Sequence, residues 1–266
     1  MRKIMKLALE QEQLNIKKLY DRFDGYEIHL YGDQRDDFDL EKQIVKPIVT
    51  VHYPIDRCDV YDAVDEFKSE YAQKVYQLCK KRDAGLVLHA ETSLNKLLTN
   101  PYLMDFCDFI KQQGIRLHIE NCYRNVGAIE GLKVMNYLKD HIGKDNVFPL
   151  LDTCHLIMSE MSFKFDEMSF FSTIDAYQSD RFIIHLNDCI GSGEKETGGT
   201  HGTNFYANQY LLGNILWKLT EMPNGRNVDL VLEVDEVDYH YPTNADILAK
   251  NVEKYWKQFY KEKNID

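Results

Sequence analysis

The sequence predicts an α/β fold, a (β/α)8 TIM barrel that forms one domain over residues 1–266. Two observations support this prediction. Short, strongly apolar runs alternate with longer amphipathic stretches, and about eight such pairs fit the chain length. Runs of this kind are typical of parallel strands that are buried on both faces. An open doubly wound sheet is the alternative, but the G-x-G-x-x-G motif that often follows its first strand is absent.

The predicted strands follow one another along the whole chain. They are residues 3–9, 26–31, 48–53, 85–90, 115–120, 147–152, 182–187 and 229–234. Between the third and fourth strands, residues 60–80 carry apolar side chains at helical spacing, which predicts one crossover helix. Glycines mark the boundaries: Gly25, Gly85 and Gly114 precede strands, and Gly143 follows a predicted helix.

Composition and charge exclude several classes of protein. The chain is 44% apolar, enough for a sizeable core, and it contains no long charge-free apolar stretch that would predict a membrane span. Its formal charge of −11 disfavours polyanionic partners. The six cysteines form no C-x-x-C pair, and the first ten residues do not read as a signal peptide. We therefore expect reduced thiols and a cytoplasmic location.

Ionisable residues recur at the C-terminal ends of the predicted strands, where a buried strand should be apolar. They are His52, His89, Glu120, Asp152, His185 and Glu233. In a TIM barrel these ends meet at one mouth, where active sites are built. Unpaired buried charges are costly, so we expect a divalent metal to bind these groups. Mixed His, Asp and Glu ligands suit Zn²⁺, Mn²⁺ or Co²⁺, and we expect no cysteine ligand at these ends.

The remaining histidines receive separate interpretations. His155, three residues after Asp152, and His201, in the Gly-rich loop after the seventh strand, enrich the predicted cluster. His118 and His29 are interpreted as packed, hydrogen-bonded barrel residues. We place His141 at a helix C-terminus and His240 near the rim of the mouth. The Gly-rich loop itself, residues 191–202, is interpreted either as a phosphate cradle or as a flexible lid.

A series of short motifs resembles the xylose isomerase-like TIM barrels, which include sugar isomerases and epimerases as well as endonuclease IV. In chain order the motifs are YEIHL, VHYP, LHAE, HIEN, LDTCH, HLND and LEV, which span most of the sequence. The resemblance implies that Glu120, Asp152, His185 and Glu233 bind metal. In the isomerases and epimerases this set holds one divalent ion, typically Mn²⁺, and the residue that corresponds to His155 contacts the substrate.

The resemblance to endonuclease IV implies a different metal content. There the cluster holds three zinc ions, and its further ligands correspond to His52, His89, His155 and the His of an Asp-x-His pair, here His201. This chain has Gly199 in place of that Asp, and Gly202-Thr203-Asn204 in place of the usual Gly-Glu-Gly. Gln34-Arg35 resembles the Gln-Arg pair with which endonuclease IV enters DNA, although acidic residues flank it.

We therefore expect a metal-dependent sugar or sugar-phosphate isomerase or epimerase that transfers protons through a metal-stabilised enediolate. Glu120 and Glu233 would be its acid and base, and His155, Asn187 and His201 would bind the substrate. The alternative is an endonuclease IV-like (AP endonuclease family 2) zinc phosphodiesterase acting on abasic DNA. It would hold two or three zinc ions, and Glu120 would bridge two of them. The absent loop Asp and a short first-strand loop, residues 10–13, disfavour DNA. Homodimers are common among such barrels, so a homodimer is compatible with either hypothesis.

Overall fold

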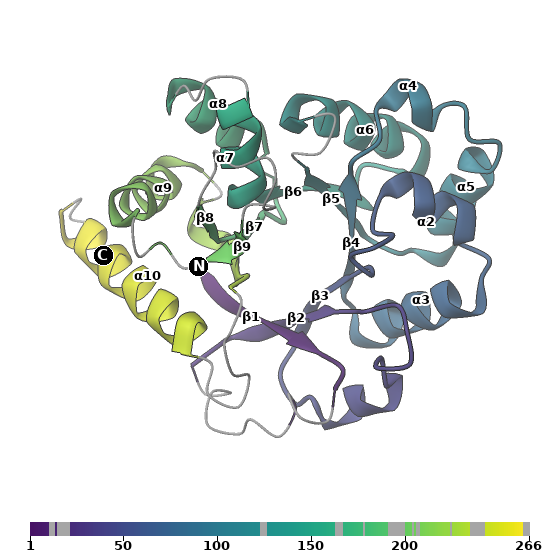
Figure 1. Ribbon diagram of the computed structural model, residues 1–266, viewed down its shortest axis with the longest axis horizontal. Coiled ribbons are helices and arrows are strands. Elements are labelled where there is room, and N and C mark those ends of the chain that lie inside the picture. Colours follow the sequence, from purple (N-terminus) through teal and green to yellow (C-terminus); the bar gives the residue numbers. More distant parts are fainter. Residues whose placement is uncertain are drawn as a thin grey trace.

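Eight parallel strands form a closed barrel in the computed structural model, in the order β1-β10-β7-β6-β5-β4-β3-β2 (Figure 1). Their bounds are β1 (Arg2–Ala8), β2 (Gly25–His29), β3 (Ile48–His52), β4 (Gly85–Ala90), β5 (Leu117–Asn121), β6 (Val147–Asp152), β7 (Ile183–His185) and β10 (Asp229–Leu232). The structure describes residues 1–10, 14, 22–122, 127–162, 167–177, 179–190, 200–203, 205, 208–223, 225–234 and 243–262. The predicted TIM barrel is confirmed, and each strand end differs from its prediction by at most two residues.

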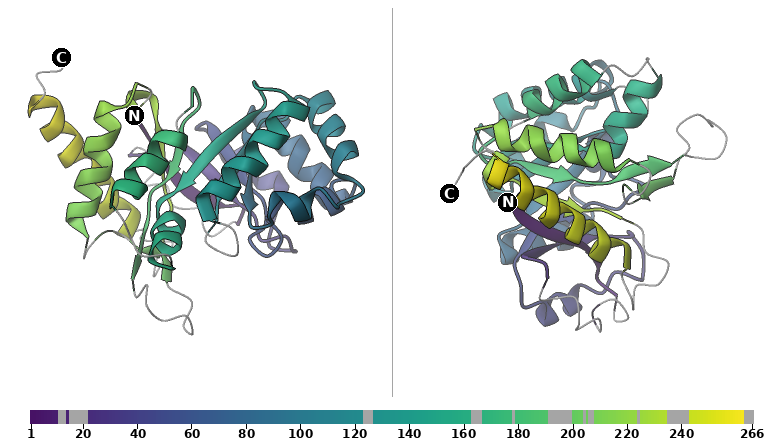
Figure 2. Two further views of the ribbon diagram at one scale, coloured as in Figure 1. Left: turned by 90° about the horizontal axis from the view of Figure 1, so that it is seen from above. Right: turned by 90° about the vertical axis from the view of Figure 1, so that its left-hand side faces the viewer.

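Helices surround the barrel on its outside, as the views in Figures 1 and 2 show. They are α2 (Val60–Glu66), α3 (Glu70–Arg82), α4 (Leu94–Leu97), α5 (Leu103–Gln113), α6 (Gly127–Ile142), α7 (Thr153–Ser162), α8 (Glu167–Tyr177), α9 (Gln209–Glu221) and α10 (Thr243–Glu262). The main hydrophobic core lies between this layer and the strands, where the apolar stripe of each helix is buried. None of the described helices is long and apolar enough to cross a membrane.

Two predictions about the connections were wrong. Residues 60–80 form two helices, α2 and α3, because Ser69 adopts an extended conformation and its side chain caps α3 by accepting from the amide of Ala72. Between β2 and β3 the structure has the 3₁₀ helix η1 (Phe38–Gln43) in place of a full crossover helix. A second 3₁₀ helix, η2 (Gly225–Asn227), precedes β10.

A small antiparallel pair outside the barrel joins β7 to α9 and was not predicted. It consists of β8 (Asp188–Ile190) and β9 (Thr200–Thr203). Most of the Gly-rich loop, residues 191–199, lies outside the described residues, so both interpretations of that loop stay predictions. Two glycine predictions are confirmed: Gly114 ends α5 with φ 65° and Gly143 follows α6 with φ 132°.

Candidate metal centre

The alternation of side chains along each strand explains why the polar residues at the strand ends all point into the barrel. A small apolar cluster separate from the main core contains Val87, Leu150, Ile183 and Val231, together with Ile4. His89, Asp152, His185 and Glu233 each follow one of the first four by two positions, and alternate residues of a strand point to the same face. The apolar cluster therefore plugs the barrel, and the polar residues form the next layer toward the mouth.

Strand register brings these residues to the same height. His89 is paired with Glu120 across β4 and β5, and Asp152 is paired with His185 across β6 and β7. Asp152 also begins the next element, because its Oδ1 accepts a 2.6 Å hydrogen bond from the amide of His155 at the start of α7. This capping bond leaves Oδ2 directed toward the site.

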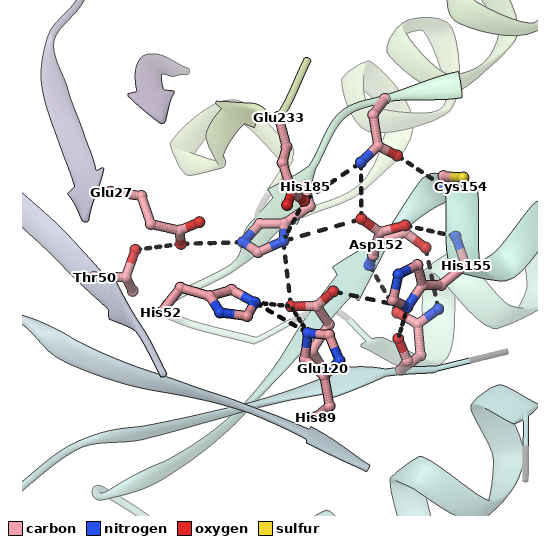
Figure 3. Close-up of polar contacts among 12 residues, drawn as sticks. Glu27, Thr50, His52, His89, Glu120, Asp152, Cys154, His155, His185 and Glu233 are labelled. Carbon is pink, nitrogen blue, oxygen red and sulfur yellow. Dashed lines mark hydrogen bonds and ion pairs between the residues drawn. The ribbon is translucent and has the colours of Figure 1, made fainter. Parts of the chain in front are cut away.

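The first cluster unites the four residues expected to bind metal, as Figure 3 shows. Nδ1 of His185 lies 2.9 Å from Oε2 of Glu233, 3.2 Å from Oε2 of Glu120 and 4.0 Å from Oδ2 of Asp152. These residues are buried, and among the described residues neither His185 Nδ1 nor Glu120 Oε2 makes a hydrogen bond of normal geometry. Ligand atoms that converge without hydrogen-bonding one another fit a bound cation.

Electrostatics within the first cluster also fit a bound cation. Burial alone would lower the pKa of His185, but the carboxylates of Glu120, Glu27 and Glu233 raise it well above its ordinary value. Burial would raise the pKa of Glu120, yet His185 and His89 hold it well below its usual range. A proton on His185 thus occupies the place of the metal, and binding a divalent ion would release it.

A second cluster shares the same glutamate oxygen. Nε2 of His52 and Nε2 of His89 lie 3.0 Å apart, and they lie 3.6 and 3.5 Å from Oε2 of Glu120. Ligands of a tetrahedral zinc ion at metal–ligand distances of about 2.0–2.1 Å are separated by about 3.3 Å. The triangle therefore has the size of one face of a zinc tetrahedron, and Glu120 is placed to bridge two ions.

Backbone carbonyls select the tautomers that metal binding needs. Nδ1 of His52 donates to the carbonyl of Tyr53 at 2.7 Å, and Nδ1 of His155 donates to the carbonyl of Asn121 at 3.0 Å. In both imidazoles the neutral form then carries its lone pair on Nε2. His52 thus points its lone pair at the second cluster.

A cysteine lies just beyond one strand end, beside the histidines, although no cysteine ligand was expected there. Cys122 directly follows β5, and its sulfur lies within 4.8 Å of ligand nitrogens of His89 and His155. Burial would raise the pKa of this thiol, but contacts with His155 and His89 outweigh burial and lower it. Sequence reasoning considered only the last residue of each strand, whereas the mouth also includes the residues that follow.

Glu27 is the main site residue that sequence reasoning missed. Its fully buried carboxylate accepts hydrogen bonds from Nε2 of His185 at 3.0 Å, from the hydroxyl of Thr50 at 2.6 Å and from Nε2 of His29 at 2.7 Å. Burial opposes ionisation, but His185 and His29 lower the pKa of Glu27 below its ordinary value. A carboxylate within the apolar run of residues 26–31 was the signal that could have revealed it.

Asn187 and Lys6 also border the first cluster. The side-chain amide of Asn187 donates to Oδ2 of Asp152 at 3.0 Å and to Oε2 of Glu233 at 3.3 Å, and its Oδ1 accepts from the amide of Cys154. These bonds hold two carboxylates in place, so the geometry favours a positioning role beside the predicted substrate contact. Lys6, on β1, was not predicted and places its ammonium 3.8 Å from Oε1 of Glu233.

The other predicted residues have different outcomes. His201 lies on β9, but its side chain is outside what the structure describes, as are His240 and the first-strand loop at residues 11–13. Arg35 of the Gln-Arg pair is exposed and bound to Asp33 through its guanidinium, so its charge is already matched. His141 donates from Nδ1 to the carbonyl of Tyr137 in the last turn of α6, as expected for a helix end.

The two barrel histidines differ from each other. His29 is hydrogen-bonded to Glu27, as predicted, but it also stacks on His52 at the mouth, with ring centroids 4.5 Å apart. Burial lowers its pKa to about 4, so it is neutral at pH 7. His118 is packed against Phe148 one layer deeper, as predicted, but its Nδ1 has no hydrogen-bond partner among the described residues. The hydrogen bond predicted for His118 is therefore not made by Nδ1.

A cavity of about 590 Å³ at the opposite end of the barrel is distinct from this centre. Arg2, Arg82, Arg116 and Arg181 line it, together with acidic residues. The first three guanidinium groups are bound to the carboxylates of Asp229, Glu41 and Asp83, and that of Arg181 lies over the ring of Phe148. Three of the four charges are therefore matched by carboxylates within the fold.

Comparisons with known proteins agree with this architecture. No family model and no curated protein matches the sequence. Among solved structures, a D-tagatose 3-epimerase-like protein is 15% identical, with 99% of each chain covered and a TM-score of 0.57. The IolI protein with a bound zinc atom is 13% identical, covering 98% of this chain and 99% of its own, with a TM-score of 0.58.

A third solved structure, an AP endonuclease of family 2 from Brucella melitensis, is 14% identical. It covers 91% of this chain and 96% of its own, with a TM-score of 0.52. These likenesses extend over nearly the full length, so the chain has the fold of the xylose isomerase-like TIM barrels. At such identities they establish the fold and leave the activity to be argued from the site.

Proposed function

We propose that this protein is a divalent-metal-dependent isomerase or epimerase of a small sugar or sugar phosphate. The observation that supports this most is the placement of two glutamates around one histidine. Oε2 of Glu233 and Oε2 of Glu120 lie 2.9 and 3.2 Å from Nδ1 of His185, and they come from strands separated by β6 and β7. Two carboxylates that approach one point from different strands could serve both faces of a reacting carbon.

The residues divide the work of proton transfer between them. A divalent ion held by Glu120, Asp152, His185 and Glu233 would supply electrophilic stabilisation of negative charge on neighbouring substrate oxygens. One glutamate would take a proton from carbon and the other would return it. His155, buried at the start of α7, would orient a substrate hydroxyl.

The depth of the centre favours a small substrate. His52, His89, Glu120, Asp152, His185 and Glu233 are each at most 5% exposed. A sugar can descend to side chains at this depth, whereas a duplex would need a broad, basic approach surface. The overall charge of −11 and the pairing of Arg35 with Asp33 both disfavour such a surface.

A zinc phosphodiesterase is the second candidate, and one observation favours it. The triangle of His52, His89 and Glu120 has the dimensions of a second zinc position that shares Oε2 of Glu120 with the first. Two ions bridged by a carboxylate could stabilise the attacking and leaving oxygens of a phosphodiester. Gly199 in place of an Asp counts against a third ion with a carboxylate ligand.

Hydrogen exchange at substrate carbon tests the proposal directly. The metal-loaded protein, incubated in D₂O with a panel of ketoses, aldoses and their phosphates, should place deuterium beside the carbonyl of its substrate, detected by NMR. Glu120→Gln and Glu233→Gln should abolish this exchange. Glu70→Gln, the same substitution at an exposed glutamate on α3, should leave the exchange unchanged.

Two results would overturn the isomerase proposal. One is cleavage of an abasic duplex that persists through repurification and disappears in Glu120→Gln, without exchange into any sugar. The other is the finding of two or three tightly bound zinc ions per chain in a protein that also cleaves the abasic duplex in this way. Either result would establish the phosphodiesterase.

A further inference from the structure

Two imidazoles and a thiol meet beside the carboxylate-rich cluster. His89 lies near the end of β4, Cys122 follows β5 and His155 lies in the first turn of α7, and all three side chains are buried. One ligand atom of each lies within 4.8 Å of the others, and the rings of His89 and His155 meet edge to face with centroids 5.4 Å apart. Three separate segments of chain thus converge on one point.

The chemistry of this group differs from that of the first cluster. Two nitrogens and a sulfur form a soft donor set, which selects Zn²⁺ or Co²⁺ over Mn²⁺ or Mg²⁺. Nδ1 of His155 donates to the carbonyl of Asn121, so Nε2 of this residue carries the lone pair. Three protein ligands leave a fourth tetrahedral position open, as in catalytic rather than structural zinc sites.

We propose that His89, Cys122 and His155 form a thiolate-containing zinc site next to the carboxylate-bound ion. The site goes beyond the proposed function, because an isomerase reaction needs only the ion held by the four residues of the first cluster. A zinc ion here would occupy Nε2 of His155, and its open fourth position would then take the substrate hydroxyl that this imidazole was proposed to orient. His89 belongs to both this group and the triangle with His52 and Glu120.

Cys58 is the competing thiol near His89, and the geometry favours Cys122 over it. The thiol of Cys58 donates to the carbonyl of Ile55 at 3.4 Å, and the third member of its group is Glu91, a partly exposed carboxylate. Cys122 instead has a buried imidazole on each side. Its donor set is therefore both softer and better closed from water.

Cobalt substitution tests the site without any assay of activity. The full chain is stripped with a chelator and reloaded with Co²⁺, and its near-ultraviolet spectrum is recorded. A thiolate bound to Co²⁺ gives an intense charge-transfer band, which we expect in the wild type and not in Cys122→Ser. Cys58→Ser and Cys107→Ser, which alter buried cysteines outside the site, should keep the band. Among these cysteine variants, only Cys122→Ser should lose one zinc ion per chain.

X-ray absorption of the zinc-loaded wild type gives a second readout that does not depend on the folding of a variant. It should show a sulfur neighbour at about 2.3 Å from zinc. Cobalt-loaded wild type without the band, zinc without a sulfur neighbour, or loss of the band in Cys58→Ser but not Cys122→Ser would each overturn the proposal. Asp152→Asn should lose the carboxylate-bound ion and keep the band, which separates this site from the proposed function.

Discussion

Glu27 supports the metal centre from beneath, although it ligates nothing itself. Its carboxylate accepts a hydrogen bond from Nε2–H of His185, so that Nδ1 of this imidazole faces Glu120 and Glu233. A carboxylate behind a ligating imidazole fixes the tautomer and ring orientation and increases the basicity of the ligand. Thr50 holds this carboxylate in turn, so two residues of β2 and β3 determine how His185 is presented.

We predict that Glu27→Gln lowers zinc affinity by about 10–100-fold, as is usual when such a partner of a ligating histidine is lost. The amide keeps an acceptor for His185 but loses the negative charge. Competition with a chromophoric chelator at pH 7 measures the change. Thr50→Ser keeps the hydroxyl and should bind as the wild type does, whereas Thr50→Val should be intermediate. Equal affinity in Glu27→Gln and wild type would contradict this role.

His118 shows the cost of a titratable group in the barrel interior. Burial, assisted by the charge of Arg116, lowers its pKa to about 3 from an ordinary value of 6.5. Gly85 makes room for it, because a Cβ on Gly85 would lie 2.3 Å from the imidazole Cδ2. Between pH 6.5 and 3 the unfolded chain binds the proton that the folded chain does not, so His118 makes the fold less stable as the pH falls.

We predict that His118→Leu removes this acid sensitivity. From pH 7 to pH 5, His118 should account for a loss of about 2 kcal/mol of unfolding free energy in the wild type, and the variant should lack that part of the loss. Urea unfolding at the two pH values measures it. Phe148→Leu, which removes the stacked ring but no titratable group, should lower stability equally at both. A wild-type pH dependence in His118→Leu would show that other groups cause it.

The break between α2 and α3 is a property of tertiary packing more than of helical periodicity. Phe67, at the end of α2, is buried against Phe106 and Phe109 of α5, with centroids 5.8 and 5.4 Å away. Ser69 then leaves the helical conformation and restarts the helix as its N-cap. An uninterrupted helix would satisfy the same spacing, so periodicity could not distinguish the two arrangements.

We predict that Ser69→Ala destabilises the fold by about 1 kcal/mol, the usual loss when a capping hydroxyl is removed. The hydroxyl oxygen of Ser69 accepts from the amide of Ala72 at 3.1 Å, and that amide would lose its partner. The urea midpoint gives the change. Ser69→Asp restores an acceptor and should unfold near the wild-type midpoint. A neutral Ser69→Ala would mean that packing of Phe67 alone maintains the break.

Part of the net negative charge of the chain lies buried at the mouth of the barrel and not on the surface. Four buried carboxylates, those of Glu27, Glu120, Asp152 and Glu233, belong to the centre and contribute to the formal −11. Without metal, protons on histidines such as His185 offset part of this charge, and a divalent ion would bring twice the charge of a proton that it displaces. Metal binding should therefore contribute to the stability of the entire barrel.

We predict that a chelator lowers the melting temperature and that added Zn²⁺ or Mn²⁺ restores it. Free metal at 100 times its dissociation constant would contribute about 2.7 kcal/mol. Asp152→Asn should respond less to the chelator than the wild type does, because only the proposed site at Cys122 remains to be emptied. Asp105→Asn, on the exposed face of α5, should respond as the wild type does. Unchanged metal occupancy in Asp152→Asn would refute the shared centre.

The barrel and the polar strand ends could be predicted because both are local properties of the chain. A buried parallel strand appears as an apolar run, and a polar residue at its end, such as Asp152 or His185, stands out against that run. The order of strands and helices then fixes which ends meet. Polar strand ends and motif order together were thus enough to select the residues of the first cluster.

The contacts of individual atoms could not be predicted, because they depend on register and barrel closure. Glu27 and His185 are 158 residues apart and meet only because β2 and β7 belong to one closed ring. Cys122 lies one residue beyond its strand and reaches His89 only through the pairing of β4 with β5. Spacing along the chain shows on which face of a strand, and near which end, a residue lies. Residues that bind the same ion must place their ligand atoms within a few ångströms of one another, and only the packed barrel determines those positions.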